Sequence, residues 1–338
     1  ATHTPFRLII VDNASDRETA QYLESARERN PKAVNIIRNN ENLGWVKAVN
    51  QGLFYSQSSY VCVMNNDTVV YPGWLNQMTS VAEKEETIGL VNPLWELPRR
   101  YKARCGDYFN KVVSRQGGEY IETDWARGFC FLIKRKVINK IGGLDEAFSP
   151  GYYDDWDYSA RAQEAGFRCV RAKGAFVWHY IGKTYSGVLG RRVADELFQD
   201  KGKVFYRRWG RPLKGLLIID THLNKDPAQL RKIILLLLRE QNKLFIISSQ
   251  KLNDVEHTSC RAKYFINSML GLRAAINIMD NFRHSASKRY NFIICSPEIG
   301  KFFKWLPFIR NNYLIKEFKD LVNEKDLLND LTKLKKYE

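Results

Sequence analysis

Residues 60–75 read YVCVMNNDTVVYPGWL, and the polar triplet inside this stretch decides how the rest of the chain is interpreted. The apolar run at residues 60–64 predicts a buried strand, which stops at Asn65, Asn66 and Asp67. Asn and Asp favour turns because their side chains bond to their own backbone. They also suit a ligand site, since ligands of α/β sheets bind beyond the carboxyl ends of strands. The triplet alone leaves both interpretations open.

The first half of the chain alternates apolar runs with helical patterns, which is typical of an α/β fold with a mostly parallel sheet flanked by helices. Strands are predicted at residues 6–12, 33–39 and 60–64, a strand followed by a short helix at 128–144, and a strand pair at 167–172 and 175–180. Helices are predicted at residues 16–30, 43–56 and 155–166, and after Pro72.

A second, smaller α/β region follows a charged and aromatic stretch at residues 186–212, so we expect domains at 1–210 and 211–338. Its βαβ pattern predicts a Rossmann-like region. The pattern consists of a strand at 213–220, a helix at 228–242 capped by Asp226 and Pro227, a strand at 243–248, a further strand at 290–296 and a C-terminal helix at 327–338. Asp220 and His222 follow its first strand, but no Gly-rich loop does, so a docking role is favoured over a second active site.

Composition indicates a globular protein, with 44% hydrophobic and 27% charged residues in 338. The longest apolar run, Ile233 to Leu238, is far shorter than the roughly 20 residues of a membrane span. The start of the sequence has no signal-peptide pattern. The six cysteines are scattered, with no pair or cluster at metal spacing, which predicts reduced thiols, a cytoplasmic location and no structural zinc.

The positive charge lies mainly in the second half of the chain. Residues 190–338 hold 29 Lys and Arg against 16 Asp and Glu, a net +13 of the total +16. This excess suggests a polyanionic partner, either nucleic acid or an anionic membrane face. A merely solvated basic surface explains it equally well, and no nucleic-acid-binding motif is present.

Four stretches in order resemble family 2 glycosyltransferases of the GT-A fold, in particular the bacterial rhamnosyltransferase-like branch. They are IIVDNASD (9–16), NENLGWVKAVNQGL (40–53), VMNNDTVVYPGWL (63–75) and GGLDEAFSPGYYDDWDYSARAQEAGFRC (142–169). Two later segments, FVWHYIGKTYS (176–186) and VFYRRWG (204–210), fit as well, so the resemblance covers about residues 6–210. The family's usual first strand, before the one that ends at Asp12, has no counterpart in the sequence.

The resemblance implies that Asp12, Asn42, Gly44 and Asn65 bind the donor nucleotide. Asp12 at a strand end would accept a hydrogen bond from the imide N–H of a uracil or thymine ring. Its structural alternative is a cap or turn residue. Gly44 would let the backbone approach the nucleotide, or would only allow a special backbone angle at a helix entry. Asn65, in place of the family's first acid, would bond a ribose hydroxyl without adding charge.

By the same resemblance, Asp67 is the last acid of the family's metal motif and would hold Mg²⁺ or Mn²⁺ against the sugar-nucleotide diphosphate. One carboxylate suffices, because Mg²⁺ is often bound by one or two carboxylates plus substrate phosphates. His179 matches a family histidine near the metal, although a lone His after an apolar strand is often structural. Imidazole would suit Mn²⁺ better than Mg²⁺.

The acids of YYDDWDYSARAQ supply the catalytic expectation. The resemblance makes Asp155 the general base that takes the proton of the acceptor hydroxyl, and Asp154 an acceptor-orienting residue. For Asp157, stabilisation of the helix dipole is the preferred interpretation. The acceptor or its sugar would also meet Trp125, Arg127, Gly128 and Trp156. Trp125 could stack on a sugar face or belong to the core.

The resemblance therefore implies an inverting, metal-dependent transferase that moves a sugar from a UDP- or dTDP-sugar to a hydroxyl of a glycan or lipid-linked acceptor, in cell-surface polysaccharide synthesis. It would act in the cytoplasm, with peripheral contact to the inner membrane face. A non-catalytic scaffold that binds through the basic half is the alternative. A nucleic-acid binder is disfavoured, since acids at the sheet edge would repel phosphates.

Overall fold

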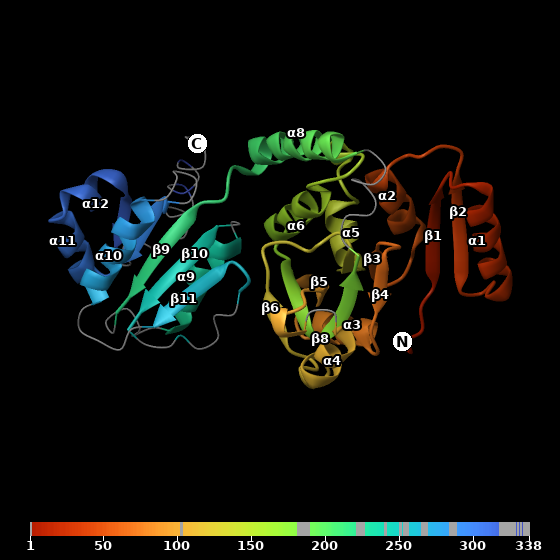
Figure 1. Cartoon of the computed structure of the whole chain (residues 1–338), viewed down its shortest axis with the longest axis horizontal. Helices are drawn as coiled ribbons and strands as arrows, with labels where there is room; N and C mark the ends of the chain where they lie inside the picture. The colour runs from red at the N-terminus through yellow and green to blue at the C-terminus, as the bar shows by residue number, and fades with distance from the viewer. Residues whose placement is uncertain are drawn as a thin grey trace. The chain divides into compact units, whose positions relative to one another are not determined.

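The computed structural model of the chain divides into two compact units, residues 1–208 and 209–338, which are described separately here (Figure 1). The residues that the structure describes are 2–101, 104–180, 190–220, 227–239, 242–249, 252, 257–264, 270–283, 289–317, 329, 331 and 333.

The first unit alternates strands and helices as predicted up to α3. Its strands are β1 (Leu8–Asn13), β2 (Val34–Asn39), β3 (Tyr60–Met64), β4 (Thr68–Val70), β5 (Ile88–Leu94), β6 (Tyr120–Glu122), β7 (Cys130–Lys134) and β8 (Arg168–His179). Its helices are α1 (Arg17–Arg29), α2 (Trp45–Tyr55), α3 (Trp74–Glu83), α4 (Cys105–Lys111), α5 (Arg135–Ile141), α6 (Asp154–Glu164) and α8 (Arg191–Trp209). The sequence did not predict β4, β5, β6, α4 or α8.

The strands of this unit form two sheets. β1 and β2 pair in parallel as a sheet of two strands, and no described strand pairs with the other edge of β1. The second sheet has the order β3-β7-β5-β8-β4, with β6 on β8. In it β5 and β8 run parallel, whereas β3–β7, β5–β7, β4–β8 and β6–β8 are antiparallel.

Helices cover both faces of the larger sheet. Successive strand residues point to opposite faces, so Leu132 packs with Met78 of α3 in one core cluster, while Phe131 contacts Tyr158 of α6 on the other side. Figure 1 shows α3 and α6 on different sides of these strands. Both helices are thereby fixed by buried apolar contacts rather than by helix propensity alone.

The predicted strand pair at 167–172 and 175–180 is wrong, because one strand, β8, runs through both segments. Lys173 and Gly174 form no turn. The register against β5 instead jumps from Ala172 to Phe176, so the intervening residues bulge out of the ladder. A Cβ on Gly174 would lie 2.9 Å from the Gln116 carbonyl oxygen, so glycine is required there by close approach of another backbone segment.

The second unit is a five-stranded parallel sheet with the order β11-β10-β9-β12-β13. Its elements are β9 (Lys214–Ile219), α9 (Pro227–Arg239), β10 (Lys243–Ser248), β11 (Cys260–Tyr264), α10 (Leu270–Phe282), β12 (Phe292–Cys295), α11 (Pro297–Lys304), α12 (Pro307–Asn312) and β13 (Leu314–Glu317). The βαβ prediction for β9, α9 and β10 is confirmed, and β11 was not predicted. Asp226, His222 and nearly all of the predicted C-terminal helix lie outside the described residues.

Two apolar clusters sandwich this sheet. α9 packs on one face through residues such as Ile234 and Leu238, and α10, α11 and α12 pack on the other through Ala274, Phe303 and Ile309. Figure 1 shows α10, α11 and α12 gathered on one side of the strands. Most strand pairs in the described chain are parallel, and the predicted α/β class is confirmed.

A buried ion-pair cluster fixes the position of α6 in the first unit. Asp157, 0% exposed, accepts from Arg161 at 2.8 Å and from Arg208 of α8 at 2.7 Å. Arg161 also donates to the Ile141 and Gly143 carbonyls, and Arg208 to Asp145. Asp157 lies in the first turn of α6, where the helix dipole also favours it.

Replacing Asp157 with Asn should lower the free energy of unfolding by roughly 1 to 3 kcal/mol, because breaking one side of a buried pair leaves charge uncompensated. The cost is moderated because Arg161 and Arg208 keep other acceptors. Urea unfolding measures it, with Glu196→Gln as control, since the Arg192–Glu196 pair is 91% and 60% exposed and should matter by less than about 0.5 kcal/mol. Equal stability of the two variants would contradict this prediction.

Candidate active site

Asp155 is held at the start of α6 by two backbone amides. Gly128 N–H donates to its Oδ2 at 2.8 Å and Trp156 N–H to its Oδ1 at 2.9 Å. The preceding residues Tyr152 and Tyr153 adopt positive φ angles of 73° and 63°, a conformation that costs energy in residues other than glycine and gathers at functional sites. The Asp155 side chain is only half-buried, so one acid of the triplet stays accessible.

Asp154, the neighbouring acid, is buried at 5% exposure and accepts a hydrogen bond from Trp45 Nε1 at 2.9 Å. Burial raises its pKa to about 7, and the charge of Asp155 adds to the increase. Burial also raises the pKa of Asp155, but the Gly128 amide and the Arg127 charge favour its ionised form. The Gly128 and Trp156 N–H donors therefore favour the ionised form of Asp155, against the effect of burial. The structure places Asp154 against Trp45, the first residue of α2.

Asp67 and His179 form the predicted metal-binding pair. The antiparallel pairing of β4 with β8 brings His179 Nε2 to 3.1 Å from Asp67 Oδ1. Apart from this contact with His179, the buried Oδ1 has no hydrogen-bond partner in the described part of the chain, so it keeps lone-pair capacity for a cation. Asn65 Nδ2 lies 3.4 Å from His179 Nε2. The described residues contain no group of three or more His, Cys, Asp and Glu able to hold a metal, so a divalent cation bound by this pair would need further ligands from substrate or water.

One short segment connects this pair to Asp155. Gly128 bonds Asp155, and the next residue, Phe129, stacks on His179 with ring centroids 4.9 Å apart. The Phe129 carbonyl also accepts a hydrogen bond from the backbone N–H of Asn65 at 2.8 Å. Asp155 and the Asp67–His179 pair therefore both lie against the Gly128–Phe129 dipeptide.

Asn92 in β5 holds this segment in place, and the sequence interpretation missed it. It is 1% exposed, accepts from Arg127 N–H at 2.8 Å and donates to the Arg127 carbonyl at 3.1 Å. Its signal in the sequence is a single amide within the apolar run IGLVNPL. A buried amide requires such partners, since an unpaired one is costly.

Three of the expected donor residues, Asp12, Asn42 and Gly44, lie just before α1 and α2, whereas Asn65 lies after β3 beside His179. Asp12 accepts from Ser15 N–H at 2.9 Å and forms a short ion pair with Arg38, which sequence reasoning missed. Burial alone would raise the pKa of Asp12, but the Ser15 hydrogen bonds and the Arg38 charge outweigh it and lower the pKa. The N-cap of α1 is Asp16, not Asp12. The structure thus shows Asp12 in turn and ion-pair contacts.

Asn42 and Gly44 form the loop before α2. Asn42 Oδ1 accepts from Gly44 N–H at 2.9 Å, and Gly44 has φ +80°. A Cβ there would lie 2.8 Å from Pro150 Cβ, so both the angle and the close contact require glycine. Asn13, which follows Asp12, donates to the Gly44 carbonyl at 3.2 Å, so this loop joins the Asp12 region to Trp45 and through it to Asp154.

The expected acceptor residues form an aromatic and cationic cluster. Trp125 and Trp156 stack with ring centroids 4.3 Å apart, and both are partly exposed. The Arg127 guanidinium lies 5.3 Å from the Trp125 ring centre, and its residue is exposed. The two indoles offer apolar faces next to Asp155, which is how proteins commonly bind sugar rings.

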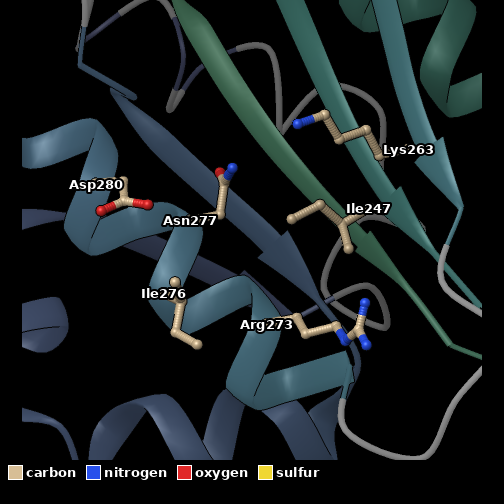
Figure 2. A pocket seen from close by; sticks show the side chains of 6 residues that line it. All are labelled: Ile247, Lys263, Arg273, Ile276, Asn277 and Asp280. Atoms are coloured by element: carbon tan, nitrogen blue, oxygen red, sulfur yellow. The ribbon is translucent and has the colours of Figure 1, made fainter.

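A cavity of about 230 Å³ in the second unit is separate from these residues. Figure 2 shows the residues of β10, β11 and α10 that line it, namely Ile247, Lys263, Arg273, Ile276, Asn277 and Asp280. None of the residues predicted from the sequence to bind a substrate lines it.

Replacing Asp154 with Asn should make folding stability less dependent on pH. The pKa of Asp154 rises from 3.8 to about 7 on folding, so the folded state keeps a proton that the unfolded chain releases in this window. Stability is then full below about pH 4 and falls by roughly 2 to 4 kcal/mol as pH rises through 7. Asn still accepts the Trp45 bond. The Tm advantage of Asp154→Asn over wild type should grow from pH 5 to pH 8, and parallel Tm curves would refute the assignment.

The sequence model of the family described as Glycosyl transferase family 2 matches residues 1–142. The uncharacterized protein y4gI of Sinorhizobium fredii is 23% identical over 197 residues, and the match covers 52% of this chain and 21% of that protein. The N-acetylglucosaminyl-diphospho-decaprenol L-rhamnosyltransferase of Mycobacterium tuberculosis is 25% identical over 270 residues, covering 66% of this chain and 84% of that protein.

Among solved structures, the mannosyltransferase PcManGT from Pyrobaculum calidifontis, in complex with GDP-Man and Mn²⁺, is similar with a TM-score of 0.45 and 17% identity, over 61% of this chain and 56% of that one. The chain spans about a fifth of the length of the first relative and most of the second. The match of the family's sequence model to residues 1–142, less than half of the chain, agrees with the resemblance of the ordered motifs to family 2 glycosyltransferases.

Proposed function

We propose that the first unit, with the residues up to 210, is the GT-A catalytic domain of an inverting glycosyltransferase that uses a UDP- or dTDP-sugar. The observation that carries this is the Gly128–Phe129 dipeptide, which places the accessible carboxylate of Asp155 beside the Asp67–His179 pair. A single displacement needs a base for the incoming hydroxyl and a bound cation for the departing diphosphate. Asp155 would supply the first, and the Asp67–His179 pair would hold the second.

In this mechanism Asp155 accepts the proton of the acceptor hydroxyl while its oxygen forms the new bond to the anomeric carbon and the bond to the diphosphate breaks. The Gly128 and Trp156 amides keep the Asp155 carboxylate in place and favour its ionised form before the reaction. Asp67 and His179 would hold Mg²⁺ or Mn²⁺, which when bound neutralises charge on the diphosphate. Asn65 is placed next to this pair to meet a hydroxyl of the nucleotide.

We propose a lipid-linked acceptor and a role in cell-surface polysaccharide synthesis. The support is the Mycobacterium tuberculosis relative, whose name describes transfer of rhamnose to a diphospho-decaprenol carrying N-acetylglucosamine. The Trp125–Trp156 stack beside Asp155 suits a saccharide on the acceptor.

Replacing Asp155 with Asn should lower kcat/KM for transfer by about 10²- to 10⁴-fold, because the acceptor hydroxyl loses its base. Calorimetry should show that binding of UDP with Mn²⁺ persists in this variant, since Asp155 is not one of the two proposed metal ligands, Asp67 and His179. Asp107→Asn in α4 is a matched control at an exposed acid and should keep full activity.

Undiminished turnover of Asp155→Asn would remove the base assignment. Absence of any heat with UDP and Mn²⁺ in the wild-type chain would instead favour the alternative of a non-catalytic scaffold. A screen of nucleotide sugars for hydrolysis then identifies the donor.

We propose that the second unit contacts an anionic membrane face in the cytoplasm. α11, the following turn and α12 expose Phe302, Trp305 and Phe308 at 41%, 84% and 37%, respectively. Lys301 and Lys304 of α11 are exposed as well. Exposed aromatic rings beside lysines are typical of surfaces that lie in the interface of an anionic bilayer. Among the described residues, no helix is long and apolar enough to cross a membrane.

Replacing Trp305 with Ala should weaken binding to vesicles of phosphatidylglycerol and phosphatidylcholine by about tenfold, because one indole no longer enters the interface. Cosedimentation measures this, and added salt should weaken the wild-type chain too. Tyr22→Ala, at another exposed aromatic residue (66% exposed) in α1, should bind as the wild type does. Equal binding by Trp305→Ala and wild type would refute this surface.

A further inference from the structure

Two arginines, one from β8 and one from the loop before β7, lie on one indole next to the proposed active site. The Arg171 guanidinium, from β8, is 3.9 Å from the ring centre of Trp95, and the Arg127 guanidinium is 5.6 Å from the same ring. Trp95 follows the last residue of β5 and is partly exposed. Three segments far apart in the sequence thus build one surface. It consists of Arg127 and Arg171, here called the arginine pair, and of Trp95, which both guanidinium groups contact.

The positive charge of the arginine pair is poorly compensated. Burial lowers the pKa of Arg171, and the charge of Arg127 lowers it further. The ion pair to Glu96 is long, at 3.7 Å, and that glutamate side chain is 69% exposed. The Arg171 side chain is only 12% exposed, and its buried Nε has no hydrogen-bond partner in the described part of the chain. Two guanidinium groups thus face one long ion pair to an exposed carboxylate, and the buried Nε donor of Arg171 remains available to an anionic ligand.

The position of the arginine pair relates it to the reacting groups. Arg127 directly precedes Gly128, whose amide holds Asp155. The Phe129 ring contacts Trp95 edge-on at 5.4 Å and stacks on His179 at 4.9 Å. One aromatic ring therefore separates the arginine pair from the metal-binding pair, and each can hold its own anion.

We propose that Arg127 and Arg171 bind a phosphate or diphosphate group of the acceptor and thereby place its hydroxyl at Asp155. This inference rests on the proposed function and specifies its acceptor as a phosphorylated one. Guanidinium groups suit phosphate because their N–H donors match its oxygens in pairs. The donor diphosphate belongs at Asp67 and His179, on the other side of Phe129. The saccharide next to the phosphate would then meet the Trp125–Trp156 stack.

The experiment compares two acceptors, a short-chain prenyl diphosphate carrying N-acetylglucosamine and an alkyl N-acetylglucosaminide without phosphate. Arg171→Gln and Arg127→Gln should each lower kcat/KM for the diphosphate acceptor by about 10- to 100-fold, as expected for one lost charge-assisted contact. For Arg171→Gln, turnover of the neutral acceptor and hydrolysis of the sugar nucleotide without acceptor should stay within about twofold of wild type. Because the Arg127 charge also favours the ionised form of Asp155, Arg127→Gln should lower these two rates as well, but by less than its rate with the diphosphate acceptor. Arg29→Gln, an exposed arginine in the last turn of α1, is the control and should change none of these rates.

Other outcomes separate the alternatives. Equal loss for both acceptors, or a parallel loss of donor hydrolysis, would show that the arginines serve the donor or the fold and would overturn the proposal. Arg127 is exposed, so its variant keeps the test valid if Arg171→Gln does not fold. If the wild type used no nucleotide sugar, the proposed function would fail. Calorimetry of the diphosphate acceptor alone would still test the arginine pair, with binding expected for wild type and its loss in Arg127→Gln.

Discussion

The hydrogen bond from the Gly128 amide to Asp155 joins two parts of the first unit that lie 27 residues apart in the sequence. It depends on Asn92, because this buried amide fixes both the N–H and the carbonyl of Arg127. The same short segment puts Phe129 on His179 and Arg127 on Trp95. A carboxylate, a metal-binding pair and a cationic surface are thus positioned by one segment, and its geometry is set from β5 beneath it.

The three acids at the start of α6 show how environment divides one motif into different roles. Asp157 forms ion pairs with Arg161 and Arg208, which balance its negative charge and hold α6 in place. Asp154 faces Trp45 in a buried position, where its pKa of about 7 lets it hold a proton near neutrality. Asp155 receives two backbone N–H groups and remains partly exposed. A protonated Asp154 spares Asp155 a second negative charge, which favours an ionised base beside it.

Elements with a strong local signal could be predicted from the sequence, and contacts between distant segments could not. The strands β1, β2, β3 and β7 follow from apolar runs, and α1 and α2 from helical spacing. β8 was predicted as two strands, at 167–172 and 175–180, whereas Gly174 between them lies in a bulge against another backbone segment. The antiparallel placement of β7 beside β3 and β5 carries no local signal at all.

The same limit applies to the candidate site. The motifs indicated Asp67, His179 and Asp155, and the structure brings these three around one dipeptide. The partners Arg38, Trp45 and Asn92 were missed, because each is an ordinary residue in its own segment and becomes specific only through a long-range contact. The resemblance predicted that Asp12 binds the nucleotide, but it did not predict the ion pair of Asp12 with Arg38. A bound nucleobase would have to share the Asp12 carboxylate with Arg38.

A metal-binding pair of only two protein ligands has consequences for the order of binding. Asn65 supplies no charge, so Asp67 is the one carboxylate that the pair contributes. A hard divalent cation needs about six ligands, and the diphosphate of the donor supplies oxygens that the protein does not. Cation and sugar nucleotide should therefore bind as one unit. The arginine pair needs no cation, so an anionic acceptor group can be held independently on the far side of Phe129. In the proposed mechanism, two anions would then occupy neighbouring positions without sharing a counter-charge, and the acceptor hydroxyl and the anomeric carbon would meet between them, next to Asp155.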